Sequence, residues 1–157
     1  MLIVLLPDDL QDDSLEAASL HWWRLERDGS PPEHGQDTLQ VLKLRFAGQR
    51  LRALAPATAV SLYRLTMPVR GTASIRAALP FALEDQLSQD LELLHCVPGP
   101  RRSDGRLAAA VVETASMERW QALFASCQWR LEALIPLPAL HAGETPDQGL
   151  MIRRSPW

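Results

Sequence analysis

The sequence LPFALEDQLSQDLE occupies residues 79–92 and completes the most regular helical pattern in the chain. Apolar side chains recur every fourth residue here, which predicts one buried face on a helix over residues 72–87: Ile75, Leu79, Leu83 and Leu87. Thr72 is expected to cap this helix. Pro80 should kink it, because proline cannot donate a hydrogen bond to the carbonyl of Arg76.

Acidic side chains gather where this helix ends: Glu84, Asp85, Asp90 and Glu92. Three interpretations stay open, namely a solvated acidic face, a docking surface for a basic partner, and carboxylates for acid–base catalysis. Neighbours such as Glu84 and Asp85 lie about 100° apart around a helix, so they do not point the same way. Carboxylates at a helix C-terminus also oppose its macrodipole, which favours a role outside the helix.

Working outward, the hydropathy pattern predicts strands at 2–6, 20–27, 51–55, 61–67, 93–97, 107–114, 129–135 and 150–153. Residues 93–97 and 107–114 would form a hairpin whose loop carries Arg101 and Arg102. A further helix should run to Cys127, with Ser116 as its cap and one apolar stripe: Met117, Trp120, Leu123, Phe124 and Cys127. The order of elements predicts an α+β fold (mixed α/β) with mixed sheets.

Some segments leave two alternatives. Residues 38–49 fit a helix capped by Asp37 or an alternating strand, with the helix favoured. Residues 28–35 predict a loop, and 136–140 a turn or short helix. Trp22 and Trp23 would face opposite sides of one strand, so either both sides are buried or one ring lies at a contact surface.

Composition and charge exclude several classes of protein. The chain has 157 residues and a net charge of −3, so a basic nucleic-acid-binding protein is not expected. Its apolar runs are far shorter than the ~20 residues that cross a bilayer. Residues 1–6 lack the basic start of a signal peptide and predict a strand. Cys96 and Cys127 are far apart, which fits two free thiols in a reducing compartment.

No pattern in the sequence predicts a catalytic residue, a cofactor or a metal. Neither GxGxxG nor GxxxxGK[ST] occurs, so the glycine-rich loop that cradles phosphates is missing. The histidines are scattered, and the serines lack a GxSxG context. His95 and Cys96 are successive strand residues, which point to opposite faces. The adjacent acids Asp8-Asp9 and Asp12-Asp13 fit solvated loops better than a Mg²⁺ site.

The stretch 79–92, followed by Leu94-His95, resembles the pattern L-P-[FYW]-x-[LV]-E-[ED]-x-[LI]-x-[ED]-D-[LV]-x-x-x-H of the cytoplasmic domain of type II secretion system protein L, the general secretion pathway protein L family. Looser similarity extends over 51–154, and the first 50 residues agree only in pattern. Leu137 stands where this family usually has Asp.

This resemblance implies an actin-like ATPase-related fold without known ATPase activity. It implies a first lobe over 1–92, an inserted small α/β subdomain over 93–135 and the start of a truncated second lobe over 136–157. Proteins of this family have a membrane span and a periplasmic domain after the cytoplasmic region, so both would lie beyond this sequence. The expected location is the cytoplasmic side of the bacterial inner membrane.

The resemblance also implies partners rather than substrates. The expected function is a non-catalytic adaptor that recruits the secretion ATPase, general secretion pathway protein E, through its N-terminal domain and couples it to platform proteins M, F and C. Exposure and charge nominate the docking residues Glu84, Asp85, Gln86, Gln89, Asp90 and Glu92, with Arg101 and Arg102 as a second choice. Two rivals are an actin-like hydrolase with Asp8, Asp9 and Glu113 around Mg²⁺, and a self-associating scaffold or homodimer.

Overall fold

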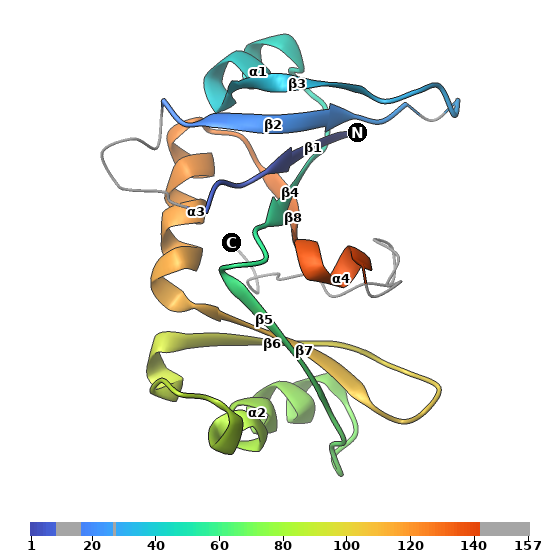
Figure 1. Cartoon of the computed structure of the whole chain (residues 1–157), viewed down its shortest axis with the longest axis vertical. Helices are drawn as coiled ribbons and strands as arrows, with labels where there is room; N and C mark the ends of the chain where they lie inside the picture. The colour runs from blue at the N-terminus through green and yellow to red at the C-terminus, as the bar shows by residue number, and fades with distance from the viewer. Residues whose placement is uncertain (9–16, 27, 142–157) are drawn as a thin grey trace.

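The strands form two separate sheets in the computed structural model, which describes residues 1–8, 17–26 and 28–141 (Figure 1). The larger sheet has the order β3-β2-β1-β4-β8 and the smaller one the order β5-β7-β6. The strands are β1 (Leu2–Leu5), β2 (Ser19–Arg24), β3 (Glu33–Thr38), β4 (Leu51–Ala55), β5 (Val60–Leu65), β6 (Leu94–Arg101), β7 (Leu107–Glu113) and β8 (Leu131–Pro136). The helices are α1 (Leu39–Arg45), α2 (Thr72–Leu83), α3 (Thr114–Ser126) and α4 (Leu137–His141).

The larger sheet is covered on both faces. Strand β1 pairs antiparallel with β2 and parallel with β4, which pairs parallel with β8. Because successive strand residues face opposite sides, Leu2 and Val4 join the core beneath α1 and α3, whereas Ile3 and Leu5 lie on the other face with α4. The α3 stripe is buried as predicted: Met117, Trp120, Leu123, Phe124 and Cys127.

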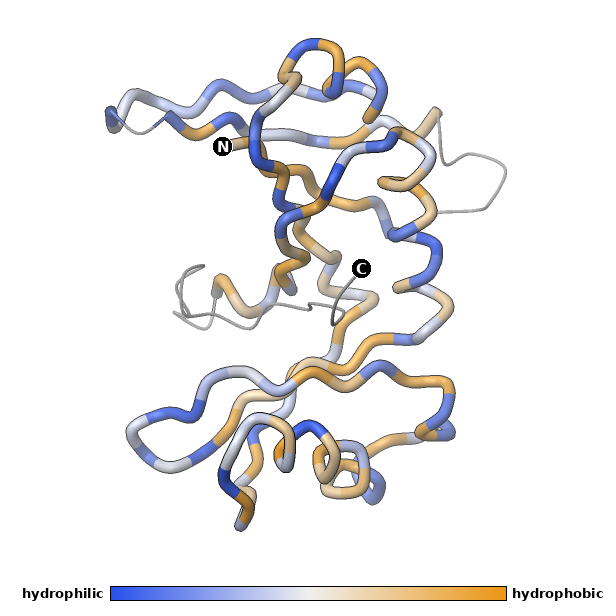
Figure 2. Tube along the Cα trace, turned by 180° about the vertical axis from the view of Figure 1, so that it is seen from behind, coloured by the Kyte–Doolittle hydropathy of each residue, from blue (hydrophilic) through white to orange (hydrophobic). Residues whose placement is uncertain are grey.

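The smaller sheet is built around β7, whose residues 107–112 are all buried. Its neighbours β5 and β6 both pair with it antiparallel, so the predicted hairpin of β6 and β7 is confirmed. One face of β7, including Ala109 and Val111, packs against Leu79 and Leu83 of α2. The other face, with Ala110 and Val112, joins the core that contains α3. Figure 2 shows hydrophobic residues along these strands and hydrophilic residues at the β6–β7 turn.

The expectation of a loop over 28–35 was wrong at its end, because β3 begins at Glu33. This strand has no apolar alternation, since it is an edge strand in which no residue is buried, and it pairs only with β2. The favoured helix over 38–49 is confirmed as α1. Its cap is Thr38, whose hydroxyl accepts from the Val41 amide at 3.4 Å. Asp37 accepts instead from Trp22 Nε1 at 3.0 Å.

Two other predicted caps were also wrong. Helix α2 begins at Thr72 after Gly71, whose φ of 93° an L-residue rarely adopts, and its N-cap makes no side-chain hydrogen bond. Helix α3 begins two residues before Ser116, with Glu113 as N-cap. Helix α2 continues through Pro80 but ends at Leu83 rather than 87, and residues Glu84–Gln86 form a 3-10 turn named η2.

The predicted α+β class is confirmed, while the expected domain boundaries at 92 and 135 stay a prediction. The two sheets group the strands differently from these boundaries, because β5 lies in one sheet with β6 and β7, whereas β8 lies in the other sheet beside β4. The strand predicted at 150–153 lies outside the described residues. Among those that are described, no helix has the length and apolar character needed to cross a membrane.

Candidate functional site

An acidic surface lies at the end of α2, as the sequence predicts. We use "acidic surface" for Glu84, Asp85, Asp90 and Glu92, which all lie in or between η2 and the 3-10 turn η3 (Leu91–Leu93) and are all exposed. None of their carboxylates forms an ion pair with a described residue. They follow the C-terminus of a helix, where negative charge is unfavourable. These carboxylates therefore do not stabilise the helix that carries them.

Phe81 stands one turn before the acidic surface and was missed by the sequence analysis. Its side chain is 70% exposed, whereas Leu79 and Leu83 on either side are fully buried. A residue two positions from a buried one lies about 200° around the helix, so the period of the buried stripe already placed Phe81 outward. An exposed phenyl ring beside unpaired carboxylates has both the apolar and the charged part of a contact surface.

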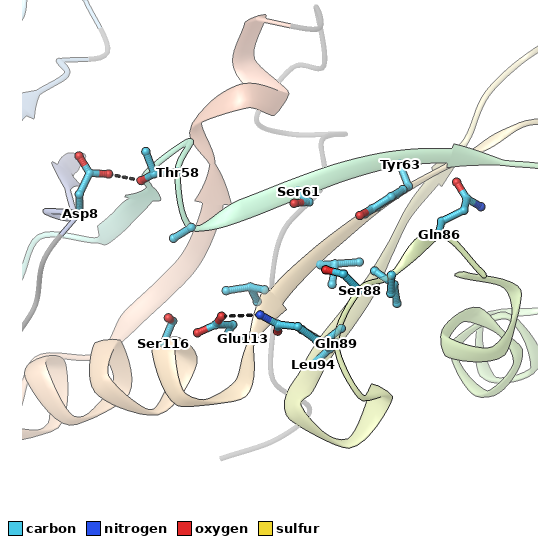
Figure 3. Close-up of a pocket in the computed structure, with 14 residues that line it drawn as sticks. Asp8, Thr58, Ser61, Tyr63, Gln86, Ser88, Gln89, Leu94, Glu113 and Ser116 are labelled. Carbon is cyan, nitrogen blue, oxygen red and sulfur yellow. Dashed lines mark hydrogen bonds between the residues drawn. The ribbon is translucent and has the colours of Figure 1, made fainter. Parts of the chain in front are cut away.

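Two of the predicted docking residues have other contacts. Gln86 and Gln89 are exposed, and both line a cavity of about 540 Å³ between the smaller sheet and the start of α3. The Gln89 amide donates to Glu113 Oε1 at 3.0 Å (Figure 3). This bond ties the segment after η2 to the N-cap of α3, so Gln89 is at least partly a structural residue.

Arg101 also has a structural task. Its guanidinium donates to the carbonyls of Gly105 at 2.8 Å, Val69 at 3.0 Å and Met67 at 3.3 Å. These bonds fix the β6–β7 turn to the segment that follows β5. Arg102, the next residue, is exposed in the same turn.

The same cavity brings together two residues of the hydrolase alternative, Asp8 and Glu113 (Figure 3). Asp8 accepts a hydrogen bond from Thr58, and Glu113 accepts one from Gln89. Asp9 lies outside the described residues. The described lining residues include hydroxyls and amides but no Lys, Arg or His that would balance the charge of a phosphate. Within the described ranges, no three His, Cys, Asp or Glu side chains form a group that could hold a metal ion.

Both cysteines are free, as expected. Cys127 is buried in the core beneath α3, and Cys96 is half-buried on β6. Burial raises the pKa of the Cys96 thiol, because a thiolate loses solvation there. At neutral pH this thiol is therefore protonated and a poor nucleophile.

Three curated relatives are all described as type II secretion system protein L. The chain is 38% identical over 86 residues to type II secretion system protein L of Pectobacterium carotovorum, covering 54% of this chain and 20% of the relative. It is 35% identical over 72 residues to the protein of Pseudomonas aeruginosa, and the match covers 46% of this chain and 19% of the relative. The protein of Dickeya chrysanthemi is 29% identical over 124 residues, and the match covers 76% of this chain and 29% of the relative. The chain thus spans less than a third of each relative's length.

Two solved structures have the same fold. One is the cytoplasmic domain of EpsL, an inner-membrane component of the type II secretion system of Vibrio cholerae, with a TM-score of 0.68 and 17% identity over 86% of this chain and 56% of that one. The other is a PilM–PilN type IV pilus biogenesis complex, with a TM-score of 0.57 and 15% identity. This match covers 91% of this chain and 49% of that one. These likenesses confirm the actin-like ATPase-related fold that the resemblance implies. The family model for type II secretion system protein L matches residues 19–139, so the chain belongs to that family.

Proposed function

We propose that this chain is a non-catalytic adaptor of the type II secretion machinery, which recruits the secretion ATPase, general secretion pathway protein E, through that ATPase's N-terminal domain. Family membership supports a place in this machinery. The Vibrio cholerae structure is described as the cytoplasmic domain of an inner-membrane component. By analogy, we place this chain on the cytoplasmic side of the inner membrane, where platform proteins M, F and C are its further proposed partners.

One observation carries the proposal: four exposed carboxylates without ion pairs among the described residues follow an exposed phenyl ring. Complementary charge steers a partner toward the surface and sets its orientation. Desolvation of an aromatic side chain then supplies most of the affinity, as in other interfaces where a few aromatic residues dominate. The proposed binding surface is therefore Phe81 with the acidic surface, and it fits a partner that presents Lys or Arg around an apolar pocket.

The cavity near Asp8 and Glu113 supports the hydrolase alternative only in part. It joins two carboxylates, which is the observation in its favour. Its described lining has no cationic side chain, and the sequence has no glycine-rich phosphate loop. We therefore propose no catalytic role for it. Saturable binding of Mg-ATP in a calorimetric titration would overturn this part of the proposal.

A pull-down with the ATPase's N-terminal domain tests the docking surface. The double reversal Glu84→Lys with Asp85→Lys should weaken capture by at least about tenfold, because it replaces attraction by repulsion at the surface. Phe81→Ser should weaken capture by a similar factor while leaving the charge unchanged. All three side chains are exposed, so these variants should fold.

The matched control is the double reversal Asp28→Lys with Glu118→Lys. It makes the same change in net charge at exposed residues in the β2–β3 turn and on α3. Capture should stay at the wild-type level. Equal capture by both double reversals would reject the acidic surface as the docking site, and equal loss by both would show a dependence on net charge alone.

A further inference from the structure

A second groove lies at the opposite end of the molecule from the acidic surface. It has a volume of about 710 Å³ and lies between α1, the C-terminus of α3 and residues 128–130, which precede β8. In Figure 1, α1 is at the top of the view and α2 at the bottom. Nothing in the proposed docking surface contributes to this groove, so the inference that follows goes beyond the proposed function.

The groove has an apolar floor and an apolar rim. Trp129 is 9% exposed, because its ring joins the core beneath α3. Leu44 stands on α1 with its side chain 84% exposed, although Leu39 and Leu42 of the same helix are fully buried. A leucine left this open forgoes the burial of its side chain, which a bound apolar group would restore.

The charged groups of the groove favour a negatively charged ligand. Lys43 and Arg130 line it, and its described lining includes no Asp or Glu. Arg130 is exposed and makes no ion pair with a described residue. Lys43 donates to the carbonyl of Cys127 and so crosses from α1 to the end of α3.

We infer that this groove binds an acidic peptide segment of a partner protein. A bulky apolar side chain of the peptide lies against Leu44 and Trp129, and a carboxylate of the peptide pairs with Arg130. An acidic peptide offers both groups, because its carboxylates can pair with a guanidinium and its apolar side chains can be buried against leucine and tryptophan.

Selection from a phage-displayed library of random peptides tests this inference. The whole chain is immobilised, and enriched peptides should carry Asp or Glu next to a bulky apolar residue. Binding of a synthetic, fluorescently labelled winner is then measured by polarisation. Leu44→Glu and Arg130→Glu should each weaken binding at least about tenfold.

The matched controls are Leu93→Glu and Arg76→Glu, which change an exposed leucine and an exposed arginine outside the groove. Both should bind the peptide as the wild type does. Circular dichroism melts check that every variant folds. No enrichment, enrichment of basic peptides, or equal binding by groove and control variants would overturn the inference. Concentration-dependent self-association that Leu44→Glu abolishes would instead assign the groove to a second copy of this chain.

Discussion

Trp22 is the residue on which the edge of the larger sheet depends. Its side chain is 1% exposed, and its indole N–H donates to Asp37. The Phe46 ring meets it edge-on with centroids 5.0 Å apart, and the Arg45 guanidinium lies 5.0 Å from its ring centroid. Such contacts hold the polar strand β3, which has no apolar face of its own.

Gly35 is opposite Trp22 in the register of β2 and β3, which leads to a first prediction. A Cβ atom at this position would lie 2.9 Å from Cζ2 of the indole. Gly35→Ala should therefore lower the free energy of unfolding by about 1–3 kcal/mol, as overpacking does elsewhere. Thermal denaturation of the variant measures the effect.

A double-mutant cycle with Trp22→Phe gives the control for Gly35→Ala. The smaller ring leaves room for the added methyl, so Gly35→Ala should cost less in the Trp22→Phe background. An equal cost in both backgrounds would mean that the indole is not the group that excludes a side chain at position 35.

Cys96 gives a second prediction at the level of one residue. Because burial raises the pKa of its thiol, alkylation by iodoacetamide should need a higher pH than for a free cysteine, whose pKa is about 8.5. Because the pKa of the Cys96 thiol is higher in the folded than in the unfolded chain, its contribution to the free energy of unfolding is fully present below the unfolded pKa. This contribution is lost as the pH rises through the folded pKa. Peptide mapping of Cys96 after labelling at a series of pH values measures the midpoint of its alkylation. A labelling midpoint at or below that of a free cysteine would contradict the burial argument.

At the level of elements, apolar periodicity was enough to predict most strands and helices. The α3 stripe is buried because a helical period of 3.6 residues turns it toward the core, and the same holds for Leu79 and Leu83 of α2. Ile75 and Leu87, which the same pattern predicted as buried, are only half-buried. Polar β3 could not be predicted, since only its pairing with β2 makes it a strand. The caps failed for a similar reason. Asp37 and Thr38 both suit an N-cap, and the indole of Trp22, far away in sequence, engages Asp37.

The end of α3 carries a third prediction. Gln128 follows the last residues of this helix with a φ of 50°, which costs an L-residue energy but suits glycine. Gln128→Gly should therefore raise the free energy of unfolding by up to about 1 kcal/mol, partly offset by the greater freedom of glycine in the unfolded chain.

Thermal melts of Gln128→Gly and of Gln128→Ala measure this effect together. The alanine variant keeps the strained conformation, so it should be no more stable than the wild type. A glycine variant less stable than the alanine variant would show that the left-handed conformation at position 128 is not a source of strain.

At the scale of the whole molecule, Phe81 and the acidic surface lie with the smaller sheet, and the groove beside Leu44 lies with the larger one (Figure 1). Two separate proposed contact surfaces suit the proposed adaptor role. The sequence predicted the exposed carboxylates correctly, because charge alone keeps them outside. It could not predict that β8 pairs with β4, since the pairing of strands so far apart in the chain depends on the whole core.

The groove could not be predicted from the sequence either, because it forms only where α1 meets the end of α3 in the folded chain. Its residues Leu44 and Arg130 are far apart in the chain, and neither belongs to a recognisable pattern. Gln89 and Arg101 show the converse: charge and polarity nominated them for docking, whereas the folded chain uses both in internal hydrogen bonds.

Calorimetric titration of the wild-type chain with the N-terminal domain of the secretion ATPase tests the adaptor proposal most directly. We predict saturable heat, with an affinity that weakens as salt rises from 0.05 M toward 0.5 M, because exposed carboxylates are screened beyond a Debye length of about 10 Å at 0.1 M. A titration without saturable heat at low salt, in a sample shown to be folded, would contradict the proposal.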